Sequence, residues 1–148
     1  MNKAVIFIGI QASGKTTFYR RYYEDHVHIS LDELRTRYQE RRLLEECVKE
    51  KRDLVIDNTN LTKEDRKRYI PLLIENGYHI TAVYFRSSVR ESLERNSRRE
   101  RQVPDLAIKG AAKRLEMPSY EEGFEKICYV SIQEDGFHIE EWREEDEL

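Results

Sequence analysis

The sequence predicts an α/β protein in which a central parallel sheet is covered by helices on both faces. Short apolar segments alternate along the chain with segments of helical periodicity, which is typical of parallel sheets. The first apolar segment, residues 4–8, leads into Gly9–Thr16, whose sequence GIQASGKT fits the phosphate-binding pattern G-x-x-x-x-G-K-T. Because strand, loop and helix follow in the required order, we predict a P-loop NTPase with a three-layer sandwich architecture rather than an accidental match in a glycine turn.

The composition predicts one soluble, helix-rich domain that spans residues 1–148. Charged residues make up 37% of the chain and hydrophobic residues 39%. No segment approaches the roughly 18 apolar residues of a membrane span, and the N-terminus enters a core strand without a secretory signal. We therefore expect a cytoplasmic protein without membrane contact. Cys47 and Cys128 lack metal-type spacing, so we expect reduced thiols.

The charge distribution leaves a nucleic-acid partner open. The net charge is −3, which argues weakly against such a partner. Residues 140–148, however, form an acidic C-terminal tail with six acidic residues and one basic residue, so the rest of the chain carries 25 basic and 23 acidic residues. Residues 86–101 hold six arginines and three glutamates. A local basic patch for a polyanion is compatible with this pattern.

The elements of the first half follow from periodicity. A helix is expected over residues 17–23, because Phe18 and Tyr22 have the i, i+4 spacing of one helix face. A strand over residues 26–30 precedes a long helix, from Ser30 to about residue 51. The imperfect apolar face of this helix consists of Leu34, Tyr38, Leu44, Cys47 and Val48.

The second half repeats the alternation. Residues 53–57 form a buried strand that ends in Asp57, and a helix runs from Leu61 until Gly77 ends it. A strand over 79–85 follows, and then a helix that begins at Ser88, which has capping-box spacing to Glu91. The next helix has Pro104 in its first turn, and its inner face consists of Ile108, Ala111, Ala112 and Leu115. The chain ends with a last core strand over 127–132 and an edge strand or packed tail over 137–142.

The carboxyl ends of the strands mark the predicted site, because parallel sheets bind ligands there. We expect four segments to lie together at this rim of the sheet: Gly9–Thr16 and residues 30–35, 57–60 and 86–88. Lys15 is expected to reach the β- and γ-phosphates of ATP, and the Thr16 hydroxyl to bind Mg²⁺. The predicted nucleotide-binding residues of the loop and the first helix are Gly9, Gln11, Ala12, Ser13, Gly14, Lys15, Thr16 and Thr17.

Asp32 and Arg35, which follow the second predicted strand, are candidates for activating or binding a phosphate acceptor. Asp32 is placed to accept the proton of an attacking hydroxyl. Alternatively, Asp32 caps its helix, or Ser30 and Glu33 form a capping box around it. Arg35, one turn further on, either holds an anionic acceptor or is an exposed helix arginine. The residues alone leave these alternatives open.

The other candidates at the rim are Asp57 and the arginines of residues 95–101. Asp57 is expected near the metal, with a loop aspartate bonded to turn amides as the alternative. A mobile segment that delivers a guanidinium to the transferring phosphate would stabilise charge there. The arginine-rich segment, residues 95–101, offers four arginines for this role, and a solvated basic helix end is the alternative for each: Arg95, Arg98, Arg99 and Arg101.

Five motifs in order, over about residues 3–132, resemble the polynucleotide 5′-hydroxyl kinase family. They read GIQASGKTTF, SLDELR, VIDNTNL, RNSRRERQVP and YEEGF. The first is general to P-loop proteins, and the DNTN and RNSRR…VP motifs are more specific. The resemblance implies an adenylate-kinase-like sheet with an arginine-rich lid, and transfer of the ATP γ-phosphate to the 5′-OH end of DNA or RNA.

Roles follow from the same resemblance. It implies that Lys15 and Thr16 bind phosphate and Mg²⁺, that Asp32 is the general base, and that Arg35 engages the acceptor phosphate. It places Asp57 near the metal and the acceptor. The implied lid arginine is Arg99, with Arg95 and Arg98 as close alternatives, and Arg95 is also expected among the nucleotide-binding residues.

The sequence departs from the family at Leu31, where members commonly have arginine before the aspartate, and it lacks a D-x-D-x-T phosphatase signature. Short or single-stranded 5′ ends fit this acidic chain better than long duplexes. Two other functions remain as alternatives. One is a small-metabolite or nucleoside kinase on the same scaffold, and the other is a nucleotide-binding regulator without transfer activity.

Overall fold

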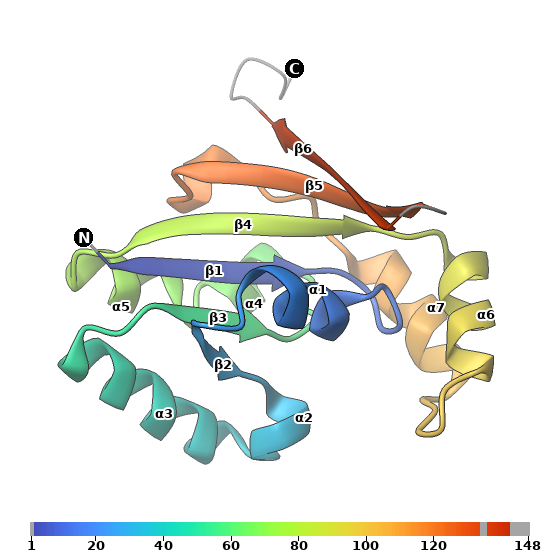
Figure 1. The fold of residues 1–148 in the computed structure, drawn as a ribbon, viewed down its shortest axis with the longest axis horizontal. Helices are drawn as coiled ribbons and strands as arrows, with labels where there is room; N and C mark the ends of the chain where they lie inside the picture. Colours follow the sequence, from blue (N-terminus) through green and yellow to red (C-terminus); the bar gives the residue numbers. More distant parts are fainter. Residues whose placement is uncertain (1, 134–135, 143–148) are drawn as a thin grey trace.

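The computed structural model describes residues 2–133 and 136–142 and contains a six-stranded sheet in the order β2-β3-β1-β4-β5-β6 (Figure 1). Five strands are parallel, as predicted, and β6 adds to the edge antiparallel to β5. The acidic tail residues 143–148 lie outside the described part of the chain. The strands are β1 (Lys3–Ile8), β2 (Val27–Ile29), β3 (Leu54–Asp57), β4 (His79–Arg86), β5 (Lys126–Gln133) and β6 (Gly136–Trp142).

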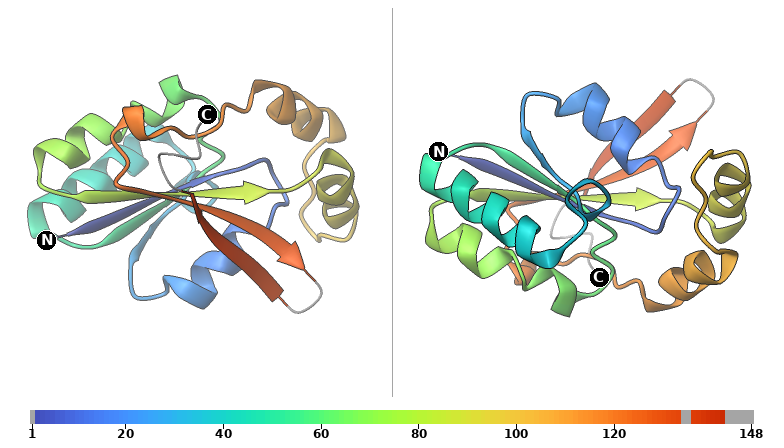
Figure 2. Two further views of the ribbon diagram at one scale, coloured as in Figure 1. Left: turned by 90° about the horizontal axis from the view of Figure 1, so that it is seen from above. Right: turned by 90° about the horizontal axis from the view of Figure 1, so that it is seen from below.

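Helices cover both faces of the sheet, which confirms the three-layer α/β prediction. In Figure 2, α1 lies on one face, α3, α4 and α5 lie on the other, and α6 and α7 lie beyond the carboxyl ends of the strands. The helices are α1 (Lys15–Tyr22), α2 (Leu31–Leu34), α3 (Arg37–Glu50), α4 (Lys63–Arg66), α5 (Ile70–Glu75), α6 (Val89–Ser97), α7 (Asp105–Arg114) and the 3₁₀ helix η1 (Tyr120–Glu122).

The central strand β1 is buried on both sides, which explains its uninterrupted apolar sequence. Ile6 and Ile8 belong to the core under α3 and α5, whereas Phe7 points to the opposite face. There Phe18 of α1 packs edge-on against Phe7, with ring centroids 5.9 Å apart, and against Phe85 at 5.2 Å. Burial of alternate residues therefore fixes α1, and with it the loop before it, on the sheet.

The long helix predicted from Ser30 to residue 51 is wrong, because the structure breaks it into α2 and α3. Arg35 adopts a left-handed conformation with φ 70°, and the Thr36 side chain then caps α3 by accepting a hydrogen bond from Gln39 N at 3.1 Å. The predicted apolar face also fails in part. Tyr38 is 66% exposed, and Glu40 is buried in its place.

The predicted helix from Leu61 to Gly77 is likewise two helices, α4 and α5, with Pro71 in the first turn of α5. Gly77 follows the last helix in a left-handed conformation, φ 77°, as predicted. Pro104 directly precedes α7 rather than lying in its first turn. Ser88 caps α6 and accepts a hydrogen bond from Glu91 N at 3.1 Å.

Two smaller predictions concern cysteines and membranes. Cys47 and Cys128 are free and buried, as expected. Among the helices that the structure describes, none has the length and apolar character required to cross a bilayer.

Candidate functional site

The phosphate loop (residues 9–16) leads from the end of β1 into α1 (Figure 1). Two of its residues have left-handed backbone conformations. Ala12 has φ 60° and Gly14 has φ 92°. A Cβ on Gly14 would lie 2.8 Å from Ile132 Cδ1, the end of a flexible side chain, so the left-handed backbone is the main reason for glycine at this position.

Lys15 is folded back over this loop. Its ammonium donates hydrogen bonds to Gly9 O at 3.0 Å and Ile10 O at 2.7 Å, and its Nζ lies 3.3 Å from Ser13 Oγ. The ammonium is therefore held over the loop by groups that an anionic phosphate can replace or supplement.

The electrostatic surroundings of Lys15 connect three elements. Burial lowers the pKa of Lys15 to about 8, and the carboxylates of Asp57 and Asp32 oppose this shift. The positive charge of Arg99 lowers the pKa of Lys15 further. The ends of β3 and α2 and the loop after α6 therefore bring their charges within electrostatic reach of one ammonium group.

Asp57 lies at the end of β3, 5% exposed, and binds two side chains. Thr16 Oγ1 donates to Asp57 Oδ2 at 3.0 Å, and His28 Nε2 lies 2.7 Å from the same oxygen. His28 Nδ1 lies 2.9 Å from Glu33 Oε1, and the Tyr19 ring stacks on the imidazole with centroids 4.0 Å apart. Burial lowers the pKa of His28, but Asp57 and Glu33 outweigh it and the pKa is raised. The contact with His28 thus fixes the orientation of the Asp57 carboxylate.

Asp32 lies exposed on α2 and does not cap its helix. Ser30 is the N-cap residue but makes no side-chain capping bond, and Glu33 binds His28 instead. The capping alternative for this segment is therefore not formed. Arg35 ends α2 in its left-handed conformation, which is costly for a residue with a side chain and is often retained at functional sites.

Arg95 connects α6 to the phosphate loop. Its Nη1 donates to Ala12 O at 3.1 Å and to Ser87 Oγ at 3.0 Å. A second link comes from Gly9 N, which donates to Thr59 O at 3.0 Å. The loop after β3 therefore contacts the phosphate loop directly, and the segment after β4 is linked to it through Arg95.

The other arginines of the arginine-rich segment are exposed and differ in their surroundings. Arg98 forms an ion pair with Glu94 of its own helix at 2.9 Å. Arg99 acts electrostatically on Lys15, as described above, and Arg101 is exposed. Thr17, at the start of α1, is also exposed.

The chemistry of the site fits a nucleotide with Mg²⁺. Thr16 and Asp57 supply the hydroxyl and carboxylate oxygens that Mg²⁺ prefers, and substrate phosphates and water usually complete its coordination. Within residues 2–133 and 136–142, no cluster of three or more His, Cys, Asp or Glu side chains is arranged to hold a metal ion. In the phosphate loop, Gln11 Oε1 is buried without a hydrogen-bond partner, as expected for a group that a ligand or water completes.

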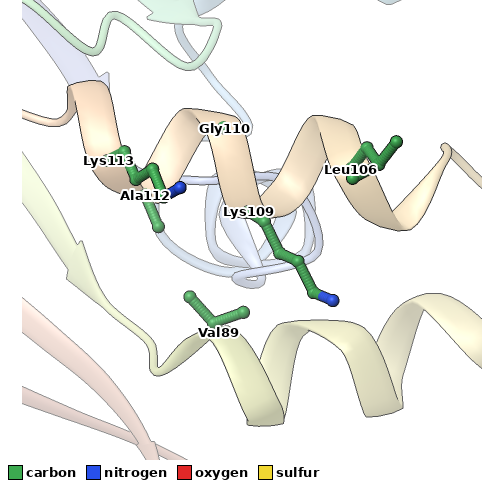
Figure 3. A pocket seen from close by; sticks show the side chains of 6 residues that line it. All are labelled: Val89, Leu106, Lys109, Gly110, Ala112 and Lys113. Atoms are coloured by element: carbon green, nitrogen blue, oxygen red, sulfur yellow. The ribbon is translucent and has the colours of Figure 1, made fainter.

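A separate hollow of about 580 Å³ lies between α6 and α7. Figure 3 shows Val89 and Lys109 facing each other across it. None of its lining residues is among those predicted for the nucleotide or the acceptor, so the hollow is not the phosphate site. The lining residues are Val89, Leu106, Lys109, Gly110, Ala112 and Lys113.

Sequence reasoning missed the support of Asp57. His28 and Tyr19 received no role, and Glu33 was considered only as a capping residue. The available signal was a histidine one residue before the end of a strand. Its meaning depends on β2 lying beside β3, with Ile29 opposite Ile56, and periodicity does not reveal this pairing.

Comparison with known proteins supports a kinase-type fold. Residues 35–118 match the family model AAA_33, described as an AAA domain. The bifunctional polynucleotide phosphatase/kinase of Schizosaccharomyces pombe is 29% identical over 136 residues, which cover 87% of this chain and 33% of the relative. The chain thus spans about a third of the length of this curated relative.

Two solved structures share the fold. Chaetomium thermophilum Kti12 in complex with ADP-AlF3 superposes with a TM-score of 0.67 and 17% identity, covering 89% of this chain and 92% of that one. A gluconokinase from Sinorhizobium meliloti superposes with a TM-score of 0.60 and 16% identity, covering 89% and 83% of the two chains. Since the family model covers more than half of the sequence, the chain belongs to the AAA_33 family and has the fold of a P-loop kinase domain.

Proposed function

We propose that this protein is an ATP- and Mg²⁺-dependent kinase that transfers the γ-phosphate to the 5′-OH end of a DNA or RNA strand. The observation that carries the proposal is the carboxylate of Asp32, which is exposed on α2 and, like Arg99, lies within electrostatic reach of Lys15. A nucleotide-binding module without transfer activity has no use for such an arrangement. The name of the S. pombe relative supports a polynucleotide as the acceptor.

The reaction assigns roles to the main predicted residues. Lys15 and the backbone N–H groups of the phosphate loop hold the β- and γ-phosphates. Asp32 accepts the proton of the 5′-hydroxyl as its oxygen bonds to the γ-phosphorus and the bond to the ADP oxygen breaks. Arg99 stabilises charge on the transferring phosphate, and Arg35 binds the acceptor phosphate nearest the 5′ nucleoside.

Thr16 and Asp57 would hold Mg²⁺, which supplies charge neutralisation for the β- and γ-phosphates. Asp57 is oriented for this by His28, and His28 is fixed in turn by Glu33 and by stacking on Tyr19. Removing such outer partners commonly weakens metal binding by about tenfold or more. Arg95 fixes the phosphate loop through Ala12 O.

A kinase for a small metabolite is a second candidate. Leu31 replaces the arginine that the polynucleotide kinase family commonly has, and the chain is acidic overall, with a net charge of −3. Both features lower the expected affinity for a polyanion.

One assay distinguishes these functions. Radiolabelled γ-phosphate of ATP is offered with a 5′-OH oligonucleotide, a nucleoside 3′-phosphate or a panel of sugars and nucleosides. Label on the oligonucleotide supports the proposal, label on a metabolite alone assigns the second candidate, and ATP binding without acceptor-dependent transfer indicates a regulator. Lys15→Met is the control, since transfer by the protein itself must disappear in this variant.

A further inference from the structure

We propose that a pocket beside the acceptor site binds a backbone phosphate of the polynucleotide strand, downstream of the phosphate at Arg35. The inference rests on the proposed function and names a further contact of the same substrate. The pocket has a volume of about 200 Å³ and lies between α3 and the segment joining α4 to α5. This arginine pocket is lined by Arg37, Glu40, Arg41, Leu44, Arg68 and Tyr69.

The floor of the arginine pocket is a fully bonded polar network. Glu40 is 2% exposed, and its carboxylate accepts hydrogen bonds from Arg37 Nη1 at 2.8 Å, Asn58 Nδ2 at 2.7 Å and Tyr69 OH at 3.1 Å. Arg37 Nη1 also donates to Tyr69 OH at 2.9 Å. A buried carboxylate is tolerated only when it is paired and hydrogen-bonded in this way. The network neutralises Glu40 and holds the Arg37 guanidinium in place.

Positive charge remains at the mouth of the pocket. Arg41 pairs with Glu45 at 2.7 Å, but both side chains are more than half exposed, and such surface pairs are weak and exchange readily. Arg68 is exposed, and no side-chain partner is recorded for it among the described residues. Guanidinium groups bind phosphate through two parallel hydrogen bonds. Arg68 therefore offers an unpaired guanidinium to an anion, and Arg41 offers one that can exchange its surface pair with Glu45 for the anion.

Asn58 connects the arginine pocket to the acceptor site. Its amide donates to Glu40, and its Oδ1 accepts a hydrogen bond from Leu31 N at 2.9 Å, next to Asp32 in the chain. Arg37 also follows Arg35 by only two residues. A strand whose 5′-OH lies at Asp32 and whose first phosphate lies at Arg35 thus has the pocket next to its path. The buried Glu40 explains Arg37 structurally. Arg41 has only a surface pair with Glu45, and Arg68 has no side-chain partner among the described residues.

The test removes Arg41 and Arg68 and compares acceptors of different length. R41Q/R68Q is measured against R42Q/K67Q, which changes the exposed neighbours of both residues and removes the same total charge. The acceptors are a 5′-OH oligonucleotide of about eight nucleotides and a nucleoside 3′-phosphate. Steady-state KM and kcat are determined for each, and KM for the oligonucleotide is followed against salt concentration.

R41Q/R68Q is expected to raise the oligonucleotide KM about tenfold or more, because two charge-assisted contacts are lost. The slope of log KM against log salt should fall by about one for each phosphate contact removed. The nucleoside 3′-phosphate KM, the ATP KM and kcat should stay within about twofold, since none of these involves the pocket. R42Q/K67Q should behave as the wild type for both acceptors.

Three results would overturn the strand subsite. The first is an unchanged oligonucleotide KM in an active R41Q/R68Q enzyme, and the second is an equal KM increase in both double variants. The third is saturable binding of inorganic phosphate that R41Q/R68Q abolishes while the oligonucleotide KM is unchanged, which would assign the pocket to a free anion. If the wild type labels no oligonucleotide at all, the proposed function itself fails, and the subsite with it.

Discussion

Asp32 is exposed on a helix of only four residues and has no capping role, so its carboxylate is free to meet a hydroxyl group. We expect Asp32→Asn to lower kcat by about 10²–10⁴, because general-base catalysis contributes a factor of this size. The Kd for ATP should change by less than about threefold, since the base contacts the acceptor and not the nucleotide. Rapid-quench kinetics and calorimetric titration with ATP measure these two quantities.

The matched control for Asp32 is Asp25→Asn, which removes an exposed carboxylate from the loop before β2, at the opposite end of that strand. It should leave both quantities unchanged. If the Asp32→Asn enzyme kept most of its turnover, another group would have to accept the proton.

Lys15 links nucleotide binding to pH. Since its pKa is lowered to about 8, Lys15 loses its charge as the pH rises above that value, whereas bound phosphates favour the charged form. We expect ATP affinity to fall above about pH 8, by up to about tenfold per unit, and binding there to take up a proton. Calorimetry in buffers of different ionisation enthalpy measures this uptake.

Two further consequences check the interpretation of Lys15. Lys15→Met should abolish the proton uptake, and a pH-independent ATP affinity in the wild type would contradict the assignment. In the absence of nucleotide, Lys15 makes folding stability depend on pH in the direction opposite to ATP affinity. Burial of the charged Lys15 destabilises the fold below about pH 8. The unfolded chain, with the ordinary pKa of 10.5, binds more protons between about pH 8 and 10.5, so this penalty is relieved and stability rises with pH in this window.

At the scale of elements, Arg66 of α4 binds the loop before its own helix, the loop after α7 and the helix η1. Its side chain is fully buried and forms an ion pair with Glu122 through two bonds, at 2.7 Å and 3.1 Å. The same guanidinium donates to backbone carbonyls of both loops: Asn60 O at 2.9 Å, Leu61 O at 3.2 Å, Glu116 O at 3.1 Å and Met117 O at 3.4 Å. The YEEGF motif, which contains Glu122, therefore has a structural role in this protein.

We expect Glu122→Ala to lower the free energy of unfolding by about 3–5 kcal/mol, because it leaves a buried guanidinium without its counter-charge. Urea denaturation measures the loss. The neighbouring exposed Glu121→Gln should stay within about 0.5 kcal/mol. Replacing the pair by Arg66→Met and Glu122→Leu should not restore the wild-type value, since the carbonyls would lose their donor. A loss of less than about 1 kcal/mol in Glu122→Ala would refute this role.

The limits of sequence reasoning also lie at the scale of elements. The phosphate loop, the strands and the rim were predicted because their signals are local: a fixed motif, apolar runs and parallel-sheet topology. The break at Arg35 was not, since a left-handed arginine carries no periodic signal. Glu40 was missed for a similar reason, because its partners Asn58 and Tyr69 lie 18 and 29 residues away in the chain. Pairing across such distances depends on tertiary packing.

At the scale of the whole molecule, nucleotide binding should stabilise the fold. ATP with Mg²⁺ at about 100 times its Kd adds about 2.7 kcal/mol, which corresponds to a rise in Tm of roughly 5–10 °C for a domain of this size. Removing Mg²⁺ with EDTA should reverse most of the shift, and Asp57→Asn should lose only the Mg²⁺-dependent part. Differential scanning calorimetry provides the measurement, and equal shifts with and without Mg²⁺ would exclude Asp57 and Thr16 as its ligands.

The antiparallel strand β6 gives part of the acidic tail a structural explanation. Glu140 and Glu141, two of its acidic residues, are exposed on this strand, at an open edge of the sheet. An edge strand presents unpaired backbone groups to which another chain can add, and charged side chains oppose such addition. Part of the acidity that argued against a polyanionic partner thus guards against edge-to-edge self-association, and neutral residues at both positions would leave the protein prone to aggregate.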